Sequence, residues 1–169
     1  IQVARDYFGL IEDERLRTHA DDGRNFIEQR RDAYDVILLD GFGAENPPHR
    51  LTTLEFLESV KTCLADQGVA VANVWGPSGN PRFDSMLKTY QSVFPGIHVI
   101  DTGHEDNFLL VCTPRRDGAT PERIAANMAD VQIERGLPLN LSRMLPDAFR
   151  DLASLRIEDA APISDKDPQ

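Results

Sequence analysis

Cysteine, tryptophan and long apolar runs are scarce in this chain of 169 residues, which contains 2 cysteines and 1 tryptophan. Cys63 and Cys112 lie far apart in apolar surroundings and lack the spacing of a zinc site, so we expect reduced thiols in the core. No apolar stretch approaches the ~20 residues of a membrane-spanning helix, and no basic and apolar leader opens the chain. We therefore expect a soluble, cytoplasmic protein without membrane association.

Basic residues are also scarce: 18 lysines and arginines stand against 28 aspartates and glutamates, which gives a formal net charge of −10. This charge argues against a nucleic-acid partner and is compatible with cationic substrates. Several catalytic signatures are missing, namely the Gly-x-Ser-x-Gly elbow, the phosphate-binding P-loop and the Cys-x-x-Cys pair. The 4 histidines are scattered along the chain, so we predict no metal site.

The stretch that organises the chain is Tyr-Asp-Val-Ile-Leu-Leu-Asp-Gly-Phe-Gly at residues 34–43. Residues 36–39 form an aliphatic run without alternation, which predicts a strand buried on both faces of a parallel sheet. Asp40 ends this strand, and the glycines that follow let the chain turn sharply. Because open α/β sheets bind ligands at the carboxyl ends of their strands, Asp40 is a candidate catalytic residue. The alternative is that Asp40 only caps the loop.

The rest of the chain alternates between helical and extended patterns. We expect helices near residues 1–8, 24–31, 53–65, 83–94 and 120–135, and strands near residues 15–20, 36–39, 69–74, 97–100 and 108–112. This order predicts an α/β fold whose parallel, doubly wound sheet ends in an antiparallel hairpin. We expect this domain over residues 1–113, followed by a helical extension at 114–169 whose last dozen residues form a frayed tail.

Three further groups are candidates for a site. Asp22 and Gly23, in the sequence Asp-Asp-Gly, could accept a hydrogen bond from the exocyclic amine of a base and let its ring approach the backbone, although this sequence is also a common turn. Glu45 and His49 lie in the loop after the central strand and either line a pocket over the strand end or are simply solvated. Trp75 ends the next strand and either walls the same crevice or packs against its loop.

Taken in order, these motifs resemble the catalytic domain of the spermidine synthase (polyamine aminopropyltransferase) family, in its bacterial spermidine synthase-like subgroup. The resemblance rests on Val-Ala-Arg-Asp-Tyr-Phe at 3–8, Arg-Leu-Arg-Thr-His-Ala-Asp-Asp-Gly-Arg-Asn-Phe at 15–26, Tyr-Asp-Val-Ile-Leu-Leu-Asp at 34–40, and the segments at 51–56 and 68–71. It covers residues 1–113. It implies a Rossmann-like fold that uses decarboxylated S-adenosylmethionine as a co-substrate, with no tightly bound cofactor and no metal.

The resemblance also implies roles for individual residues. Asp22 would contact the adenine amine with Gly23 beside it, and Asp40 would be the catalytic carboxylate between the sulfonium and the incoming polyamine. The chain departs from the family at Gly43, where members that make spermidine usually carry a second aspartate. We hypothesise that Glu45 supplies this second carboxylate, with Trp75 as a further substrate-binding residue.

In the family, the Gly-rich nucleoside loop and the acidic residue that holds the ribose lie upstream of a segment like residues 1–8. We therefore expect this chain to be the C-terminal part of a longer protein, in which two further strands separate residues 15–20 from residues 36–39. Two alternatives remain open: a methyltransferase of the same fold that uses intact S-adenosylmethionine, and a degenerate domain without catalysis. Family members are often dimers, so a homodimer is a further expectation.

Overall fold

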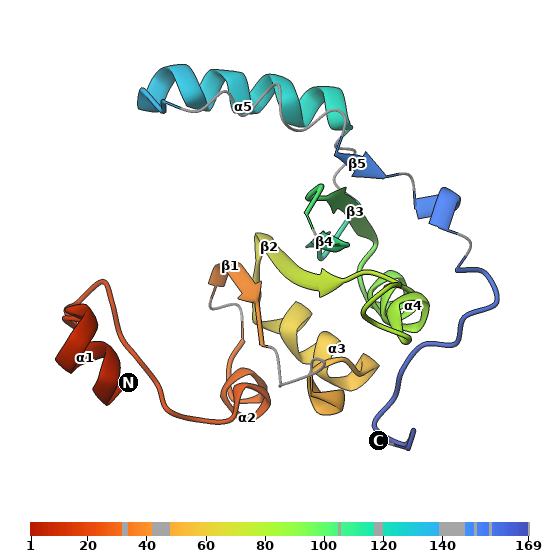
Figure 1. The fold of residues 1–169 in the computed structure, drawn as a ribbon, viewed down its shortest axis with the longest axis horizontal. Helices are drawn as coiled ribbons and strands as arrows, with labels where there is room; N and C mark the ends of the chain where they lie inside the picture. The colour runs from red at the N-terminus through yellow and green to blue at the C-terminus, as the bar shows by residue number, and fades with distance from the viewer. Residues whose placement is uncertain are drawn as a thin grey trace.

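The computed structural model describes residues 1–31, 34–41, 48–104, 106–116, 120–138, 148–150, 152–155 and 157–168. Its centre is a sheet with the strand order β1-β2-β4-β3-β5 (Figure 1). The strands are β1 (Tyr34–Leu39), β2 (Leu64–Trp75), β3 (Gly96–Asp101), β4 (Asn107–Thr113) and β5 (Phe149–Arg150). β1 and β2 are parallel, whereas every other neighbouring pair is antiparallel. The mixed sheet confirms the predicted α/β fold with its antiparallel hairpin, and β5 is an addition that the sequence did not predict.

The helices of the described part of the chain begin and end close to the predicted positions. They are α1 (Gln2–Phe8), α2 (Gly23–Glu28), α3 (Leu54–Cys63), α4 (Phe83–Val93) and α5 (Pro121–Arg135), with the short 3-10 helices η1 (His49–Leu51) and η2 (Leu152–Leu155). Thr53 and Thr120 cap α3 and α5, because each side chain accepts a hydrogen bond from a backbone N–H in the first turn. None of these helices combines the length and the apolar composition that a membrane crossing requires.

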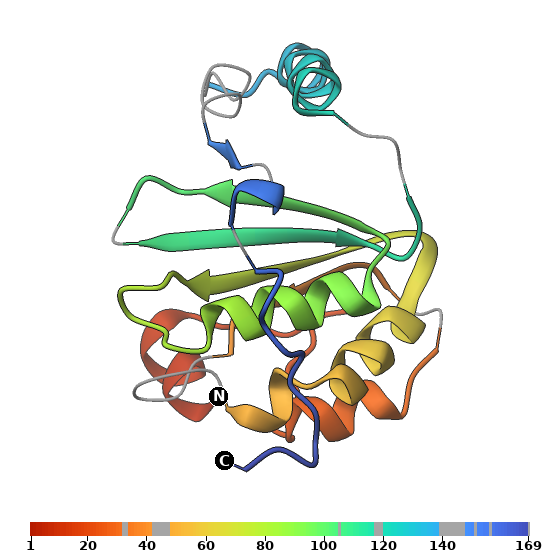
Figure 2. The same ribbon diagram turned by 90° about the vertical axis from the view of Figure 1, so that its right-hand side faces the viewer.

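The core lies between one face of the sheet and the helices α3 and α4, which run side by side across it (Figure 2). Every second residue of β2 and β4 points toward these helices and is buried. Leu57 of α3, Leu87 of α4 and Leu110 of β4 are each 0% exposed. Full burial of one such side chain stabilises a fold by about 1.5–3 kcal/mol. Cys63 and Cys112 lie in the same core without a disulfide, as predicted.

The opposite face of the sheet carries apolar side chains that the described residues do not cover. Val36 and Leu38 of β1 are 54% and 71% exposed, whereas Ile37 between them is 8% exposed. The prediction that residues 36–39 are buried on both faces is therefore wrong. The physical reason is that β1 pairs only with β2 among the described strands, and the helices that pack on it cover one face alone.

The prediction of a strand at residues 15–20 is also wrong, because this segment forms no strand in the structure. An extended segment needs a neighbour to satisfy its backbone groups, and no described strand pairs with this one. Instead, the backbone N–H and the hydroxyl of Thr18 both donate to Oε1 of Glu12, at 2.7 and 2.6 Å. These two hydrogen bonds and that from Arg5 lower the pKa of the Glu12 carboxyl to about 2.

The prediction that the last dozen residues form a frayed tail is wrong as well. This C-terminal segment, residues 157–168, crosses the outer side of α4 (Figure 2), and its Ile157 and Ile163 are 4% and 2% exposed. The backbone N–H of Ile163 donates to the hydroxyl of Thr89 in α4 at 2.9 Å. Its carbonyl accepts from the backbone N–H of Leu54 in α3 at 2.8 Å. The buried isoleucines and the hydrogen bonds of Ile163 thus hold the segment against α3 and α4.

Candidate functional site

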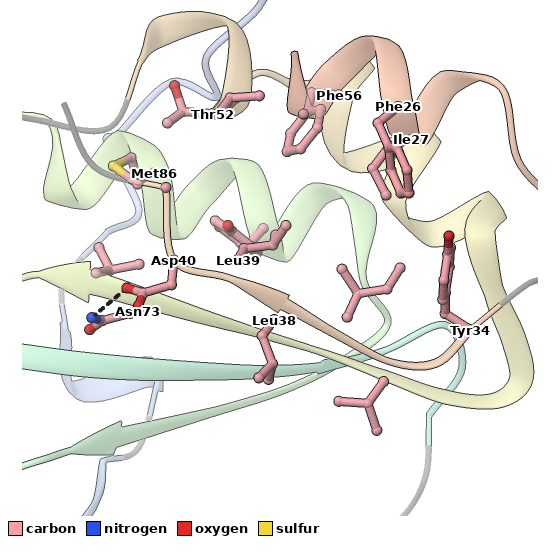
Figure 3. A pocket seen from close by; sticks show the side chains of 17 residues that line it. Phe26, Ile27, Tyr34, Leu38, Leu39, Asp40, Thr52, Phe56, Asn73 and Met86 are labelled. Carbon is pink, nitrogen blue, oxygen red and sulfur yellow. Dashed lines mark hydrogen bonds between the residues drawn. The ribbon is translucent and has the colours of Figure 1, made fainter. Parts of the chain in front are cut away.

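Asp40 lies where β1 ends, beside Asn73 of β2. The parallel register pairs Leu39 with Ala72, which places the next residue of each strand side by side on the uncovered face of the sheet. The Asn73 side chain uses this position to donate from Nδ2 to Oδ1 of Asp40 at 3.0 Å (Figure 3). Asp40 is an exposed residue, so a substrate can reach its side chain from solvent. The carboxylate is thus oriented by a neighbouring strand and left accessible.

A cavity of about 360 Å³ extends along β1 from this pair of side chains. Asp40 and Asn73 line one end of it, and Tyr34 lies at the other end of the strand (Figure 3). The wall between them is apolar and comes from α2, α3 and α4 as well as from β1. Its side chains include Phe26, Ile27, Leu39, Leu51, Phe56 and Met86. A largely apolar hollow with a few polar groups at its mouth is the usual form of a small-molecule site.

Asp22 and Gly23 lie at the start of α2, where they have separate roles. Oδ1 of Asp22 caps the helix by accepting from the backbone N–H groups of Arg24 and Asn25 at 3.0 and 3.2 Å. Its Oδ2 accepts from Nη1 of Arg50 at 2.9 Å. Asp22 therefore caps a helix, a role that was not predicted from the sequence. Gly23 itself lines the cavity, together with Asp40.

The other predicted site residues lie in different places. Glu45 falls outside the described residues. Trp75 does not line the Asp40 cavity: it is 39% exposed and lines a second depression at the same edge of the sheet, with Asp106 and Asn107. His49 begins η1 and is not among the described residues that line the cavity; its buried Nε2 has no hydrogen-bond partner in the described part of the chain.

A cluster of charges beside the cavity was not predicted from the sequence. Arg24 donates from both terminal nitrogens to the two oxygens of Asp165, each at 2.6 Å, and from Nε to Glu28 at 2.6 Å. These bonds lower the pKa of the Asp165 carboxyl to about 2 and raise the pKa of the Arg24 guanidinium. Asp165 is 141 residues away from Arg24 in the sequence, and no local pattern links them.

No group of three or more histidine, cysteine, aspartate or glutamate side chains in the described part of the chain is placed to hold a metal ion. The polar side chains among the described residues that line the cavity are instead the carboxylate of Asp40, the amide of Asn73 and the hydroxyls of Tyr34, Thr52 and Tyr90. Such an arrangement can orient an amine or a hydrogen-bonding base, and it can accept a proton at Asp40. It resembles a site for group transfer between small molecules in which the protein supplies orientation and one basic oxygen.

Comparison with known proteins gives a consistent result. Residues 1–99 match the spermine/spermidine synthase domain. The polyamine aminopropyltransferase of Vibrio vulnificus is 38% identical over 96 residues, which cover 55% of this chain and 31% of that protein. The human eEF1A lysine and N-terminal methyltransferase is 30% identical over 143 residues, which cover 76% of this chain and 20% of that protein. The chain thus spans a third or less of the length of these relatives.

Solved structures show the same two kinds of relative. Human methyltransferase-like protein 13, in complex with SAH, has a TM-score of 0.68 and 28% identity, covering 85% of this chain and 72% of that chain. A probable spermidine synthase from Corynebacterium glutamicum has a TM-score of 0.72 and 22% identity, covering 99% of this chain and 61% of that chain. The second likeness shows a shared fold. With the match over more than half of its residues, this chain belongs to the spermine/spermidine synthase domain family.

Proposed function

We propose that the chain carries the acceptor side of an aminopropyl transfer from decarboxylated S-adenosylmethionine to a polyamine. The observation that carries the proposal is the Asp40–Asn73 pair at one end of a largely apolar cavity. A donor nucleoside needs apolar walls for its ring and a polar mouth for its charged sulfonium, and this cavity has both. The membership in the synthase family supports the same reaction.

Asp40 is the residue that we assign to the chemical step. A primary alkyl amine has a pKa near ~10 and is protonated at neutral pH, so it cannot attack carbon until a proton is removed. Asp40 attracts the ammonium and accepts this proton. The nitrogen lone pair then forms a bond to the methylene carbon beside the sulfonium, and the carbon–sulfur electrons pass to sulfur, which leaves as a neutral thioether. Orientation by Asn73 and proximity supply the rest of the acceleration.

The nucleoside end of the proposal rests on Gly23 and Asp22. Gly23 lines the cavity and has no side chain that would keep a ring from its backbone; a Cβ there would meet nothing within 4 Å. Asp22 keeps one acceptor position free on Oδ2, since each carboxylate oxygen has two, and this position accepts the adenine amine. The complex of the human methyltransferase-like protein 13 with SAH supports a nucleoside of this type. The nucleoside is a co-substrate, and no resident cofactor is needed.

Glu45 keeps the role that the sequence suggested, as a partner of Asp40 in binding the polyamine. Trp75 keeps its role as a substrate-binding residue, but from the neighbouring depression rather than from the cavity itself.

Methyl transfer from intact S-adenosylmethionine is a second candidate, and one observation favours it. The likeness to the human methyltransferase covers 76% of this chain, whereas that to the Vibrio aminopropyltransferase covers 55%. A share of 76% of this chain contains more residues than the 99 that match the synthase domain. The similarity to the methyltransferase therefore extends beyond residue 99. The C-terminal part of the chain is therefore shared with a methyltransferase.

The product identifies the reaction. The full-length gene product is incubated with 1,4-diaminobutane and either decarboxylated or intact S-adenosylmethionine, and the amines are followed by mass spectrometry. An aminopropyl adduct from the decarboxylated donor is the expected result. A methyl adduct from the intact donor would replace this proposal with the second candidate, and no adduct from either donor would favour a domain without catalysis.

A further inference from the structure

The C-terminal segment holds the backbone of Asp165 in place by contacts on both sides of this residue. On one side, Ile163 hydrogen-bonds to α3 and α4 through its carbonyl and its N–H. On the other, the chain turns, because the N–H of Ser164 donates to Oδ2 of Asp167 at 2.6 Å and the N–H of Asp167 donates to the carbonyl of Ser164 at 3.1 Å. The N–H of Asp165 itself donates to Glu55 at 3.0 Å. The Asp165 side chain therefore extends from a fixed backbone.

Arg24 is the partner of this side chain, and each nitrogen of its guanidinium is engaged. Nη1 and Nη2 each donate to one oxygen of Asp165 at 2.6 Å, and Nε donates to Glu28 at 2.6 Å. Nη1 also donates to the backbone carbonyl of Arg50 in η1 at 3.3 Å. A planar guanidinium that is held at every nitrogen cannot rotate away without breaking several of these bonds. The ion pair with Asp165 therefore fixes the first turn of α2 relative to η1.

Arg50 links this ion pair to the residues that we assign to the nucleoside. Its carbonyl accepts from Arg24, and its own Nη1 donates to Oδ2 of Asp22 at 2.9 Å. Gly23 lies between Asp22 and Arg24 and lines the cavity. Neither Arg24 nor Asp165 is among the described residues that line the cavity. Any influence of the ion pair on a ligand in the cavity therefore passes through Asp22 and Gly23.

The shortness of α2 makes its first turn dependent on these contacts. The helix has 6 residues, and its buried side chain, Ile27, lies near its other end. Helices shorter than ~12–15 residues are marginal in water, so their stability comes from contacts with the rest of the fold. Without Asp165, the guanidinium of Arg24 keeps Glu28 on its own helix and one long bond to Arg50. The first turn then frays at Asp22 and Gly23.

We propose that Arg24 and Asp165 are positioning residues for the nucleoside, because their ion pair holds Asp22 and Gly23 in the geometry that receives the adenine ring. This inference rests on the proposed function and deepens it, since it makes the C-terminal segment a part of the donor site that the ligand does not touch. Asp165 lies outside residues 1–99, which match the synthase domain. Nucleoside recognition in this chain thus depends on a segment beyond that match.

The test compares two nucleosides that differ only in the group that Asp22 would recognise. They are 5′-methylthioadenosine and the 5′-methylthio derivative of purine riboside, which has hydrogen in place of the exocyclic amine. A hydrogen bond to a charged group is worth a factor of about 10–100 in affinity, so calorimetric titration of the full-length gene product should show this preference for 5′-methylthioadenosine.

Asp165→Asn keeps the size of the side chain but not its charge, and it is expected to remove most of this preference. Arg24→Lys keeps the positive charge but not the bidentate geometry, and it should have the same effect. Asp165→Glu restores the charge and should retain more of the preference than Asp165→Asn. A general loss of stability would lower the affinities for both nucleosides and leave their ratio unchanged, so the ratio separates positioning from a structural role.

The matched control is Asp159→Asn, which makes the same change at an exposed position of the C-terminal segment and should keep the preference. Equal affinity of the wild-type protein for the two nucleosides would overturn the inference, as would an undiminished preference in both Asp165→Asn and Arg24→Lys. Failure of the proposed transfer gives a different result: the preference for 5′-methylthioadenosine still depends on Asp165, and no aminopropyl product forms.

Discussion

Asp165, three residues before the last described residue, forms a bidentate ion pair with Arg24 in the first turn of α2. Both contacts measure 2.6 Å, and the Arg24 side chain is only 13% exposed. The backbone N–H of Asp165 also donates to the carboxylate of Glu55 in α3 at 3.0 Å, and this hydrogen bond reinforces the pair. The C-terminal segment therefore holds the end of α2 from which Gly23 reaches the cavity.

Asp165→Ala should destabilise the protein by about 1 kcal/mol. The change leaves the largely buried guanidinium of Arg24 without its bidentate partner, while the partial exposure of Asp165 limits the loss. Urea unfolding measures the difference. Asp159→Ala, an exposed change in the same segment, is the control and should have little effect. Equal losses from both changes would show that the ion pair contributes nothing.

The same ion pair should make stability depend on pH in the acid range. The pKa of Asp165 is lowered from 3.8 to about 2 by its hydrogen bonds with Arg24, so the folded state binds this proton less readily than the unfolded state. The stabilisation is complete above the unfolded pKa and is lost as the pH falls through about 2. The gap in unfolding free energy between wild type and Asp165→Ala should close between pH 5 and pH 2. A gap of constant size would contradict this assignment.

Local features of the fold could be predicted because their causes are local. Thr53 and Thr120 cap helices through their own first turns, and Gly9 ends α1 in the left-handed conformation that glycine adopts easily. The hairpin of β3 and β4 follows from two apolar runs with a short polar link. In each case the signal and the contact lie within about ten residues of each other.

Features that depend on distant partners were missed or misjudged. The apolar run around Val36 and Leu38 indicates a strand, but what covers each face depends on elements elsewhere in the fold. The C-terminal segment is polar enough to predict disorder, and only its docking on α3 and α4 shows that Ile163 is an anchor. Composition reports the average character of a segment, whereas one buried side chain can fix its position.

The candidate site also has one part that local sequence predicts and another that depends on distant partners. Asp40 could be singled out because a strand-end carboxylate in an α/β fold is a local signal, whereas its hydrogen bond with Asn73 depends on the parallel register of β1 and β2. The depression that Trp75 shares with Asp106 and Asn107 could not be predicted, because it depends on the antiparallel register that sets β4 against β2. The sequence shows only a polar loop there.

The core between the sheet and α3 should be far more sensitive to truncation than the uncovered face. Leu57→Ala removes a side chain that is 0% exposed and should cost about 2–5 kcal/mol, since it leaves a cavity. Leu38→Ala makes the same change at a side chain that is 71% exposed, and it should shift the unfolding free energy by about 0.5 kcal/mol or less. Chemical denaturation of both variants compares them directly. A large loss at Leu38 would mean that this face is covered in the folded protein.

Asp40→Asn tests the central claim most directly. The amide keeps the size of the carboxylate and can still accept from Asn73, but it cannot take a proton from the amine. With the full-length gene product, nucleoside and diamine bound, single-turnover kinetics should show a rate about 10²–10⁴-fold lower than that of the wild-type protein, with nucleoside affinity unchanged. A variant that transfers the group at the wild-type rate would contradict the account and remove Asp40 from the chemical step.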